Sequence, residues 1–462
     1  MPRKLKVLFV TAECIPYGTT GGLGEVSSDL PYALSEENVS ILRVLPLYRQ
    51  VDAPLKYVTD FSVPMKNYSQ TCIVKADVSD KKVATYFIGN DFYYNKDNMY
   101  GYYEDGERFL FFCKAVIEML NNISFKPDII HCNDWHTGFI PFILKAKEMD
   151  IPTIYTIHNL KYSGYIGVEY LREFNLPIGE LYSHIYPEAL DFTRAALIYS
   201  NVITTVSREY AREIQTKEYG EGYDHILRAR EKAITGIGNG INYEHYNPIQ
   251  ASVPFDLNSL EGKAENKKLL KEELGLKEED IPLLASVSRL DPQKGIDLII
   301  NMIRQTDLAY FQLIILGTGN EEYVRELTEI EKAYTGRMRF IHDFDSELAS
   351  KIYAASDMFL MPSRFEACGI GQLAAMAYGT IPIMRNVGGL KSTAEDLPKG
   401  CFIFDEYSVK AFTKAIEKAM KAYNTPRWGK MMKTCLSYDR SWKNVVNDYI
   451  QVYHDLLKVK KI

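Results

Sequence analysis

Residues 6–24 read KVLFVTAECIPYGTTGGLG and contain the most informative pattern for the architecture of the chain. An apolar run, Lys6–Ala12, is followed by a glycine-rich turn and then by an amphipathic helical pattern. Consecutive apolar residues are typical of a strand that helices cover on both faces. A strand, a tight turn and a helix in this order form one βα unit, which is the repeating element of a parallel sheet.

The same alternation continues through the chain. Short apolar runs between longer helical patterns predict the strands Val39–Leu45, Thr85–Ile88, Asp128–Cys132, Thr153–Ile157, Val202–Val206, Leu283–Val287, Gln312–Leu316, Met338–Ile341, Met358–Met361, Ile381–Met384 and Cys401–Phe404. The pattern breaks near Tyr246–Leu257, where Pro248 and Pro254 precede a charged stretch. We therefore expect an α/β chain of two doubly wound, parallel-sheet domains, with ligands bound beyond the carboxyl ends of the strands.

Length and composition limit the possible functions. The chain has 462 residues, which is more than one hydrophobic core usually supports. Its 54 basic and 60 acidic residues give a net charge of −6, which argues against a dedicated nucleic-acid binder. No apolar run reaches membrane-spanning length, and the seven cysteines form no C-x-x-C pair. We expect a cytoplasmic protein without nucleic-acid or membrane partners.

Three stretches of the first half could carry chemistry. The glycine turn Tyr17–Gly24 is either a tight strand–helix connection or a place where backbone N–H groups meet an anion. His131–His136 follows an apolar strand and contains two His and one Asp, but its spacing is not that of a helical zinc motif. Residues at a strand's carboxyl end more often line a substrate cleft, and His158 ends the next strand in the same way. We predict no metal site.

The second half has its own candidates. Arg289 and Lys294 leave a strand together, and two cations there suit a diphosphate, although most such residues are solvated surface charges. Glu366 lies just before a glycine-bearing helix start, where it either accepts hydrogen bonds from sugar hydroxyls or complements the helix dipole. Glycine turns at Gly317 and Gly388 offer further places where the backbone can approach a ligand.

Together and in this order, these motifs resemble the glycogen and starch synthase family, over residues 6 to about 450. The resemblance implies the GT-B architecture, with two Rossmann-like domains facing a cleft. It implies an N-terminal domain at 1–248, completed by a returning C-terminal helix within 442–462, and a nucleotide-sugar-binding domain at 249–441. It also implies a retaining hexosyltransferase that moves glucose from ADP-glucose to the non-reducing end of an α-1,4-glucan. ADP-glucose and the glucan would be its partners as substrates, and no cofactor is implied.

The resemblance assigns roles to individual positions. His158 would lie beside the donor sugar, Arg289 and Lys294 would hold the diphosphate, and Glu366 would bind the sugar hydroxyls; these four form the implied catalytic set. The implied donor- and substrate-binding positions are Thr19, Thr20, Gly21, Gly22, Tyr100, Asp134, Asn239, Gly317, Thr318, Phe344, Cys368, Gly369, Ile370 and Thr393. Phe344 would stack on the nucleobase.

The chain departs from the family pattern at three positions. Thr19 stands where lysine is usual, Asn242 where aspartate is common and Ala367 where proline is common. The missing cation at Thr19 would weaken substrate binding by about 1–3 kcal/mol if nothing replaces it. Two alternatives stay open: another retaining GT-B transferase with a different donor or acceptor, and a catalytically weak glucan-binding or regulatory subunit. Neither the oligomeric state nor the choice between ADP-glucose and UDP-glucose follows from the residues.

Overall fold

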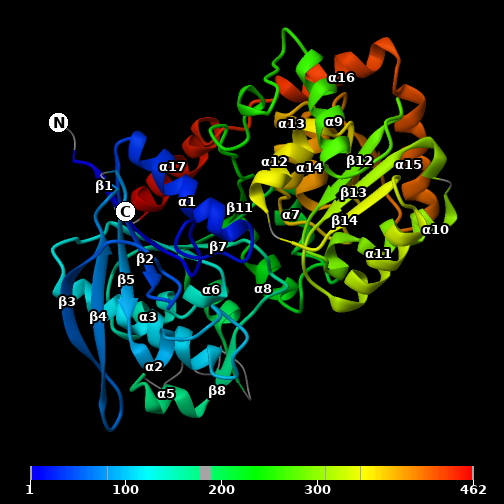
Figure 1. The fold of residues 1–462 in the computed structure, drawn as a ribbon. Coiled ribbons are helices and arrows are strands. Elements are labelled where there is room, and N and C mark those ends of the chain that lie inside the picture. Colours follow the sequence, from blue (N-terminus) through cyan, green and yellow to red (C-terminus); the bar gives the residue numbers. More distant parts are fainter. Residues whose placement is uncertain (1–2, 81, 177–188, 307, 344, 460–462) are drawn as a thin grey trace. The chain divides into compact units, whose positions relative to one another are not determined.

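The computed structural model describes residues 3–80, 82–176, 189–306, 308–343 and 345–459. The chain divides into two compact units, Met1–Gly240 with Trp442–Ile462, and Ile241–Ser441. Each unit is a sheet flanked by helices (Figure 1). The predicted α/β class with two parallel-sheet domains is confirmed, with one exception at the edge of the first sheet.

The first unit is built on a sheet with the strand order β11-β10-β7-β6-β1-β2-β5-β4-β3. Its strands are β1 (Leu5–Val10), β2 (Val39–Pro46), β3 (Leu55–Pro64), β4 (Ser69–Asp77), β5 (Ala84–Gly89), β6 (Ile129–Asn133), β7 (Thr153–Ile157), β10 (Val202–Thr205) and β11 (Ile234–Gly236). β8 (Tyr165–Gly167) and β9 (Ala189–Asp191) form a separate antiparallel pair. Every residue of β6 and β7 is buried, as the unbroken apolar runs predict.

The exception is an antiparallel hairpin that the sequence pattern did not reveal. β3 pairs with β4, and β4 pairs with β5, in antiparallel register. Both strands expose side chains along much of their length, including Tyr57 and Ile73. A strand that is half solvated has a mixed polar and apolar sequence, so it lacks the apolar run by which the buried strands are recognised.

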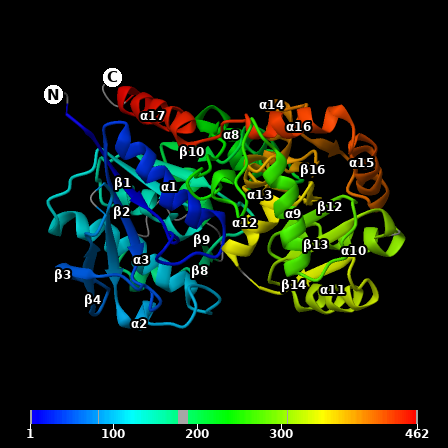
Figure 2. The ribbon, with the colours of Figure 1, turned by 45° about the horizontal axis from the view of Figure 1, so that its top comes forward.

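Helices cover the first sheet, and one of them comes from the far end of the sequence. They are α1 (Gly22–Glu36), α2 (Asp91–Tyr94), α3 (Asp105–Asn122), α4 (Ile140–Ala146), α5 (Glu169–Glu173), α6 (Phe192–Tyr199), α7 (Arg208–Glu213), α8 (Asp224–Ala229) and α17 (Trp442–Val459). α17 lies beside α1 in both views (Figures 1 and 2), and its Val445, Tyr449 and Tyr453 join a core cluster with Leu30 and Leu34 of α1. Each fully buried apolar side chain contributes roughly 1.5–3 kcal/mol, so the predicted returning helix is firmly held.

The second unit has a fully parallel sheet with the order β14-β13-β12-β15-β16-β17. Its strands are β12 (Leu283–Val287), β13 (Gln312–Leu316), β14 (Met338–Ile341), β15 (Met358–Met361), β16 (Ile381–Arg385) and β17 (Phe402–Phe404). Its helices are α9 (Glu261–Glu273), α10 (Ile296–Gln305), α11 (Glu321–Ala333), α12 (Ser346–Ala355), α13 (Gly371–Ala377), α14 (Gly388–Asp396), α15 (Val409–Ala422) and α16 (Pro426–Leu436). Figure 2 shows β12 and β13 side by side. In the described part of the chain, no helix combines the length and the apolar character that crossing a membrane would need.

The strand order of each sheet reverses direction at one place. In the first unit the chain builds outward from β1 to β2 on one side and from β6 to β7 on the other. In the second unit the corresponding neighbours are β12 and β15. Loops that leave two such strands diverge to opposite faces of the sheet, which opens a crevice at the carboxyl ends where ligands of doubly wound folds bind. Most candidate residues follow β1, β6, β7, β12 or β15, whereas Asn239, Gly317 and Thr393 come after β11, β13 and β16.

Candidate functional site

In the first unit, the glycine loop after β1 is organised by a buried carboxylate, Glu13. Its Oε2 accepts hydrogen bonds from the Thr20 backbone N–H at 2.7 Å and from the Thr19 hydroxyl at 3.2 Å. Its Oε1 accepts from the Thr20 hydroxyl at 2.8 Å and from the Tyr100 hydroxyl at 3.1 Å. The structure therefore brings Thr19, Thr20 and Tyr100 together around one side chain that sequence reasoning missed.

Gly24, close to the start of α1, allows close packing against Thr19. A Cβ on Gly24 would lie 2.2 Å from the Thr19 hydroxyl oxygen, so a larger residue does not fit there. Gly21 caps α1 and Gly22 is its first residue, which leaves backbone N–H groups at the helix start. Thr19 thus ties the loop to Glu13 through its hydroxyl group.

Asp134 and His158 form a second contact, at the ends of β6 and β7. Asp134 Oδ1 accepts from the His158 backbone N–H at 2.7 Å. The Asp134 backbone has φ 54° and ψ 178°, a region that almost only glycine adopts and that costs about 1–3 kcal/mol. A strained backbone conformation persists only where contacts with the surrounding structure stabilise it. At Asp134 one such contact is the hydrogen bond from its backbone N–H to the Thr156 carbonyl oxygen at 3.0 Å.

Burial sets the protonation of both side chains. It raises the pKa of Asp134 to about 7, against the opposing effect of the two backbone N–H groups of His158 and Asn159. It lowers the pKa of His158 to about 3, so the imidazole is neutral at physiological pH. Neutral His158 can donate or accept a hydrogen bond, but it cannot act as a strong acid.

An aromatic stack lies next to Tyr100. The Tyr100 ring is stacked on His136, with centroids 4.8 Å apart, and His136 is stacked on Trp135 at 4.2 Å.

Asn239 is the remaining candidate of this unit. It is buried and lies three residues beyond the end of β11. In the sheet, β10 separates β11 from β7.

In the second unit, Lys294 and Glu366 form a largely buried ion pair across the β12/β15 switch point. Lys294 Nζ lies 2.7 Å from Glu366 Oε2 and 3.0 Å from Oε1, and the side chains are 19% and 7% exposed. The Ser363 hydroxyl donates to Glu366 Oε2 at 3.1 Å. The loops after β12 and β15 therefore meet through two predicted catalytic residues, whereas Arg289, on the same loop as Lys294, has an exposed side chain.

Local backbone features fix Lys294 in place. Lys294 ends a single 3-10 turn, Pro292–Lys294, whose N-cap Asp291 accepts a hydrogen bond from the Gln293 backbone N–H. Gly295 follows with φ 72°, and a Cβ there would lie 2.1 Å from the Pro362 carbonyl oxygen. Glycine is thus required for the loop after β12 to pack against the loop after β15.

The remaining candidates of this unit pack around the same loops. A Cβ on Gly317 would lie 1.9 Å from the Ser288 carbonyl oxygen, and the Thr318 carbonyl oxygen accepts from the Leu290 backbone N–H at 2.8 Å. Gln372 Nε2 donates to the Cys368 carbonyl oxygen and to the Thr393 hydroxyl, both at 3.2 Å.

Gln372 is a second residue that sequence reasoning passed over as a site element. The segment that it anchors, Cys368, Gly369 and Ile370, leads directly into α13, and Gly369 has φ 76°.

Phe344 lies outside the described residues. Among the described residues, no group of three or more His, Cys, Asp or Glu side chains is arranged to hold a metal ion.

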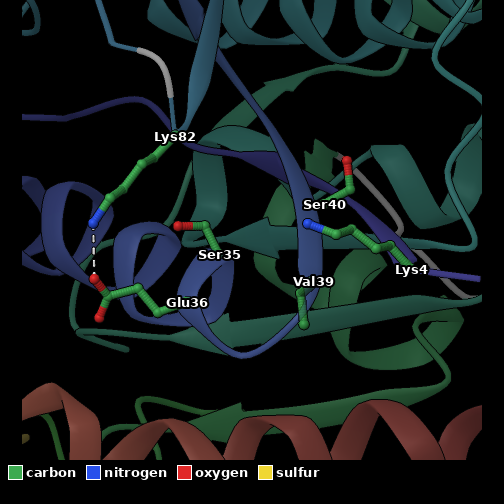
Figure 3. Close-up of a pocket in the computed structure, with 6 residues that line it drawn as sticks. All are labelled: Lys4, Ser35, Glu36, Val39, Ser40 and Lys82. Atoms are coloured by element: carbon green, nitrogen blue, oxygen red, sulfur yellow. Dashed lines mark hydrogen bonds and ion pairs between the residues drawn. The ribbon is translucent and has the colours of Figure 1, made fainter. Parts of the chain in front are cut away.

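A shallow pocket of about 320 Å³ lies elsewhere on the first unit (Figure 3). It is lined by Lys4, Ser35, Glu36, Val39, Ser40 and Lys82. Val39 begins β2 and Glu36 ends α1, so this pocket is at the amino-terminal edge of the strands, opposite the edge that carries the glycine loop. Figure 3 shows Lys82 turned toward Glu36, and this exposed ion pair of 2.8 Å makes the pocket a solvated surface feature.

Comparison with known proteins gives one consistent result. Residues 6–229 match the family described as starch synthase catalytic domain, and residues 266–432 match glycosyl transferases group 1. Glycogen synthase from Anoxybacillus flavithermus is 38% identical, with 98% of each chain covered. Glycogen synthase from Desulforudis audaxviator is 39% identical, with 99% of this chain and 97% of the relative covered.

A solved structure agrees with these relatives. The catalytic domain of starch synthase IV from Arabidopsis thaliana, bound to ADP and acarbose, is 30% identical with a TM-score of 0.91. The match covers 98% of this chain and 100% of that domain. This likeness confirms the predicted GT-B fold, and the two family matches confirm a glycosyltransferase. The chain therefore belongs to the glycogen and starch synthase family of glycosyltransferases.

Proposed function

We propose that the chain transfers glucose from ADP-glucose to the non-reducing end of an α-1,4-glucan with retention of the anomeric configuration. The Lys294–Glu366 pair carries this proposal, because it places a cation and a carboxylate where a doubly wound sheet binds its ligand. The ADP and acarbose bound to the Arabidopsis starch synthase IV domain support an adenine nucleotide donor and a glucan acceptor.

The second unit supplies the charge chemistry. Negative charge grows on the diphosphate as the bond between sugar C1 and the phosphate oxygen breaks. Lys294 offsets that charge as a point charge, and Arg289 offsets it through its planar guanidinium group. Glu366 accepts hydrogen bonds from the sugar hydroxyls and orients the ring. These cations fill the role that a divalent metal has in other transferases, and we propose no metal or other cofactor.

The first unit supplies the sugar and acceptor environment. The acceptor hydroxyl forms its bond to C1 on the face that the diphosphate leaves, and the departing phosphate takes the hydroxyl proton. His158 is suited to a hydrogen-bonding role near the sugar, because burial keeps its pKa near 3 and its ring neutral. Binding and orientation by these groups lower the barrier without a covalent intermediate.

The proposal is tested by incubating the chain with ADP-glucose, UDP-glucose and other nucleotide sugars, with and without glycogen, and measuring release of nucleoside diphosphate. We expect fast, acceptor-dependent release of ADP, a product whose new linkage is α-1,4 by NMR, and no loss of rate in EDTA. Fast release from another donor alone would point to a different transferase. Glycogen binding without release from any donor would indicate a weak or regulatory subunit.

A further inference from the structure

Asn133, the last residue of β6, holds the ring of His158. The Asn133 side chain is fully buried. Its Nδ2 donates to the Val10 carbonyl oxygen at 3.0 Å and lies 3.4 Å from the His131 carbonyl oxygen. Its Oδ1 lies 3.0 Å from His158 Nε2.

The two backbone carbonyls fix the orientation of this amide. A carbonyl oxygen only accepts, so the side of Asn133 that faces Val10 and His131 must be the NH₂ group. Turning the amide over would set its oxygen against two other oxygens and leave a buried group unsatisfied, which is costly at a fully buried position. The Asn133 oxygen therefore faces His158.

This orientation determines which nitrogen of His158 carries the proton. An amide oxygen accepts, so Nε2 must be the N–H of the neutral ring and Nδ1 must hold the lone pair. Nδ1 makes no hydrogen bond with any residue in the described ranges. The backbone N–H of His158 is held by the adjacent Asp134, so consecutive residues at the end of β6 fix both the backbone and the ring.

We propose that Asn133 is a positioning residue that keeps His158 in the Nε2–H tautomer, so that Nδ1 accepts a hydrogen bond from a hydroxyl of the donor hexose. The link to the hexose rests on the proposed function, whereas the tautomer follows from the contacts of Asn133 together with the neutrality of the buried ring. A ring in the other tautomer presents an N–H at the same place, and a sugar hydroxyl then has to reorient and accept instead of donating. The other tautomer also sets the Nε2 lone pair against the Asn133 oxygen, so both the internal hydrogen bond and the fit to the sugar are lost.

The tautomer is measured directly by correlating the imidazole nitrogens with the ring protons in ¹⁵N-labelled protein, with His158→Gln to assign the resonances. We expect the Nε2–H pattern for the wild-type chain. Asn133→Leu, which keeps the volume and removes the acceptor, should lose that pattern and lower kcat/KM by about 10- to 100-fold. Asn133→Asp, protonated on the oxygen that faces the Val10 carbonyl, keeps an acceptor oxygen toward His158 and should keep the Nε2–H pattern and more of the activity.

Asn266→Leu is the matched control. Asn266 is also buried and bonded to backbone groups, at Val253 and Gly262 of the second unit, so its loss reports general destabilisation. An Nδ1–H pattern in the wild-type chain overturns the proposal, as does an Asn133→Leu variant with an unchanged tautomer and no greater loss of kcat/KM than the control. If the wild-type chain turns over no donor, the proposed function fails, while the NMR result still decides the tautomer.

Discussion

Replacing Lys294 by methionine tests the site and the stability of the second unit together. Methionine keeps most of the side-chain volume and removes the ammonium group. Glu366, which is 7% exposed, would then be a buried carboxylate whose remaining hydrogen bond comes from the Ser363 hydroxyl. Removing one partner of a buried ion pair typically costs about 3–5 kcal/mol, because the other charge is left uncompensated.

The structure places the expected cost at the lower end of that range. Lys294 is still 19% exposed, so water can partly reach the carboxylate once the ammonium is gone. We expect a loss of about 3 kcal/mol, which lowers the unfolding temperature of a unit the size of Ile241–Ser441 by roughly 6–12 °C. The double variant Lys294→Met/Glu366→Gln should recover most of this loss, because it removes both charges.

Activity should respond differently from stability. Lys294→Met should lower kcat by about 100- to 1000-fold, since it removes stabilisation of the charge that develops on the diphosphate. Glu366→Gln should lower kcat by a similar factor, since it weakens the hydrogen bonds that orient the sugar ring. The double variant should stay inactive although it is stable, which separates catalysis from folding. Stability is measured by scanning calorimetry and activity by ADP release from saturating donor.

Lys267→Met provides the control. Lys267 and Asp357 form an ion pair of the same length, 2.7 Å, in the same unit, with side chains 12% and 13% exposed. This variant should lose a similar amount of stability and keep its kcat at a temperature where it is folded. The reasoning is refuted if Lys294→Met unfolds at the wild-type temperature, or if it turns over substrate as fast as Lys267→Met.

Three further predictions follow from buried contacts. Burial lowers the pKa of Lys263 from 10.5 to about 7, so between these pH values the unfolded chain binds a proton that the folded chain has released. The free energy of unfolding should therefore rise from pH 7 to about 10, and urea titrations should show a flatter rise for Lys263→Met. Tyr453→Phe removes a 2.9 Å hydrogen bond to His131 and should destabilise the first unit by about 1–3 kcal/mol with little change in KM, as chemical denaturation and initial rates will show. Gly389→Ala would bring a Cβ within 2.0 Å of the Cys368 carbonyl oxygen and displace the segment from Cys368 to Ile370. The KM for ADP-glucose should then rise at least tenfold, and unchanged donor binding in isothermal titration would contradict this.

Much of the fold could be predicted because buried parallel strands have a local sequence pattern. β1, β6 and β7 are runs of buried residues, and each was located from its own residues. β3 and β4 were missed because half of their side chains face water. The prediction that Asp134, His158, Lys294 and Glu366 belong to sites came from their positions after strands, and their roles remain predictions.

The residues that support these sites were harder to find. Glu13, Gln372 and Asn133 have no distinctive motif of their own. Each acts on a residue remote in sequence: Glu13 on Tyr100, Gln372 on Thr393 and Asn133 on His158. An acidic residue directly after the first strand was the one available signal for Glu13.

The alternation of strands and helices and the loops that carry chemistry could be predicted from the residues, because apolar periodicity and glycine placement act over a few neighbouring residues. Three contacts became visible in the folded chain and not before: Lys294 with Glu366, Asn133 with His158, and α17 with α1. These contacts depend on which strands become neighbours in the sheet. That order is set by the burial of whole apolar faces across long sequence separations, and no local pattern encodes it.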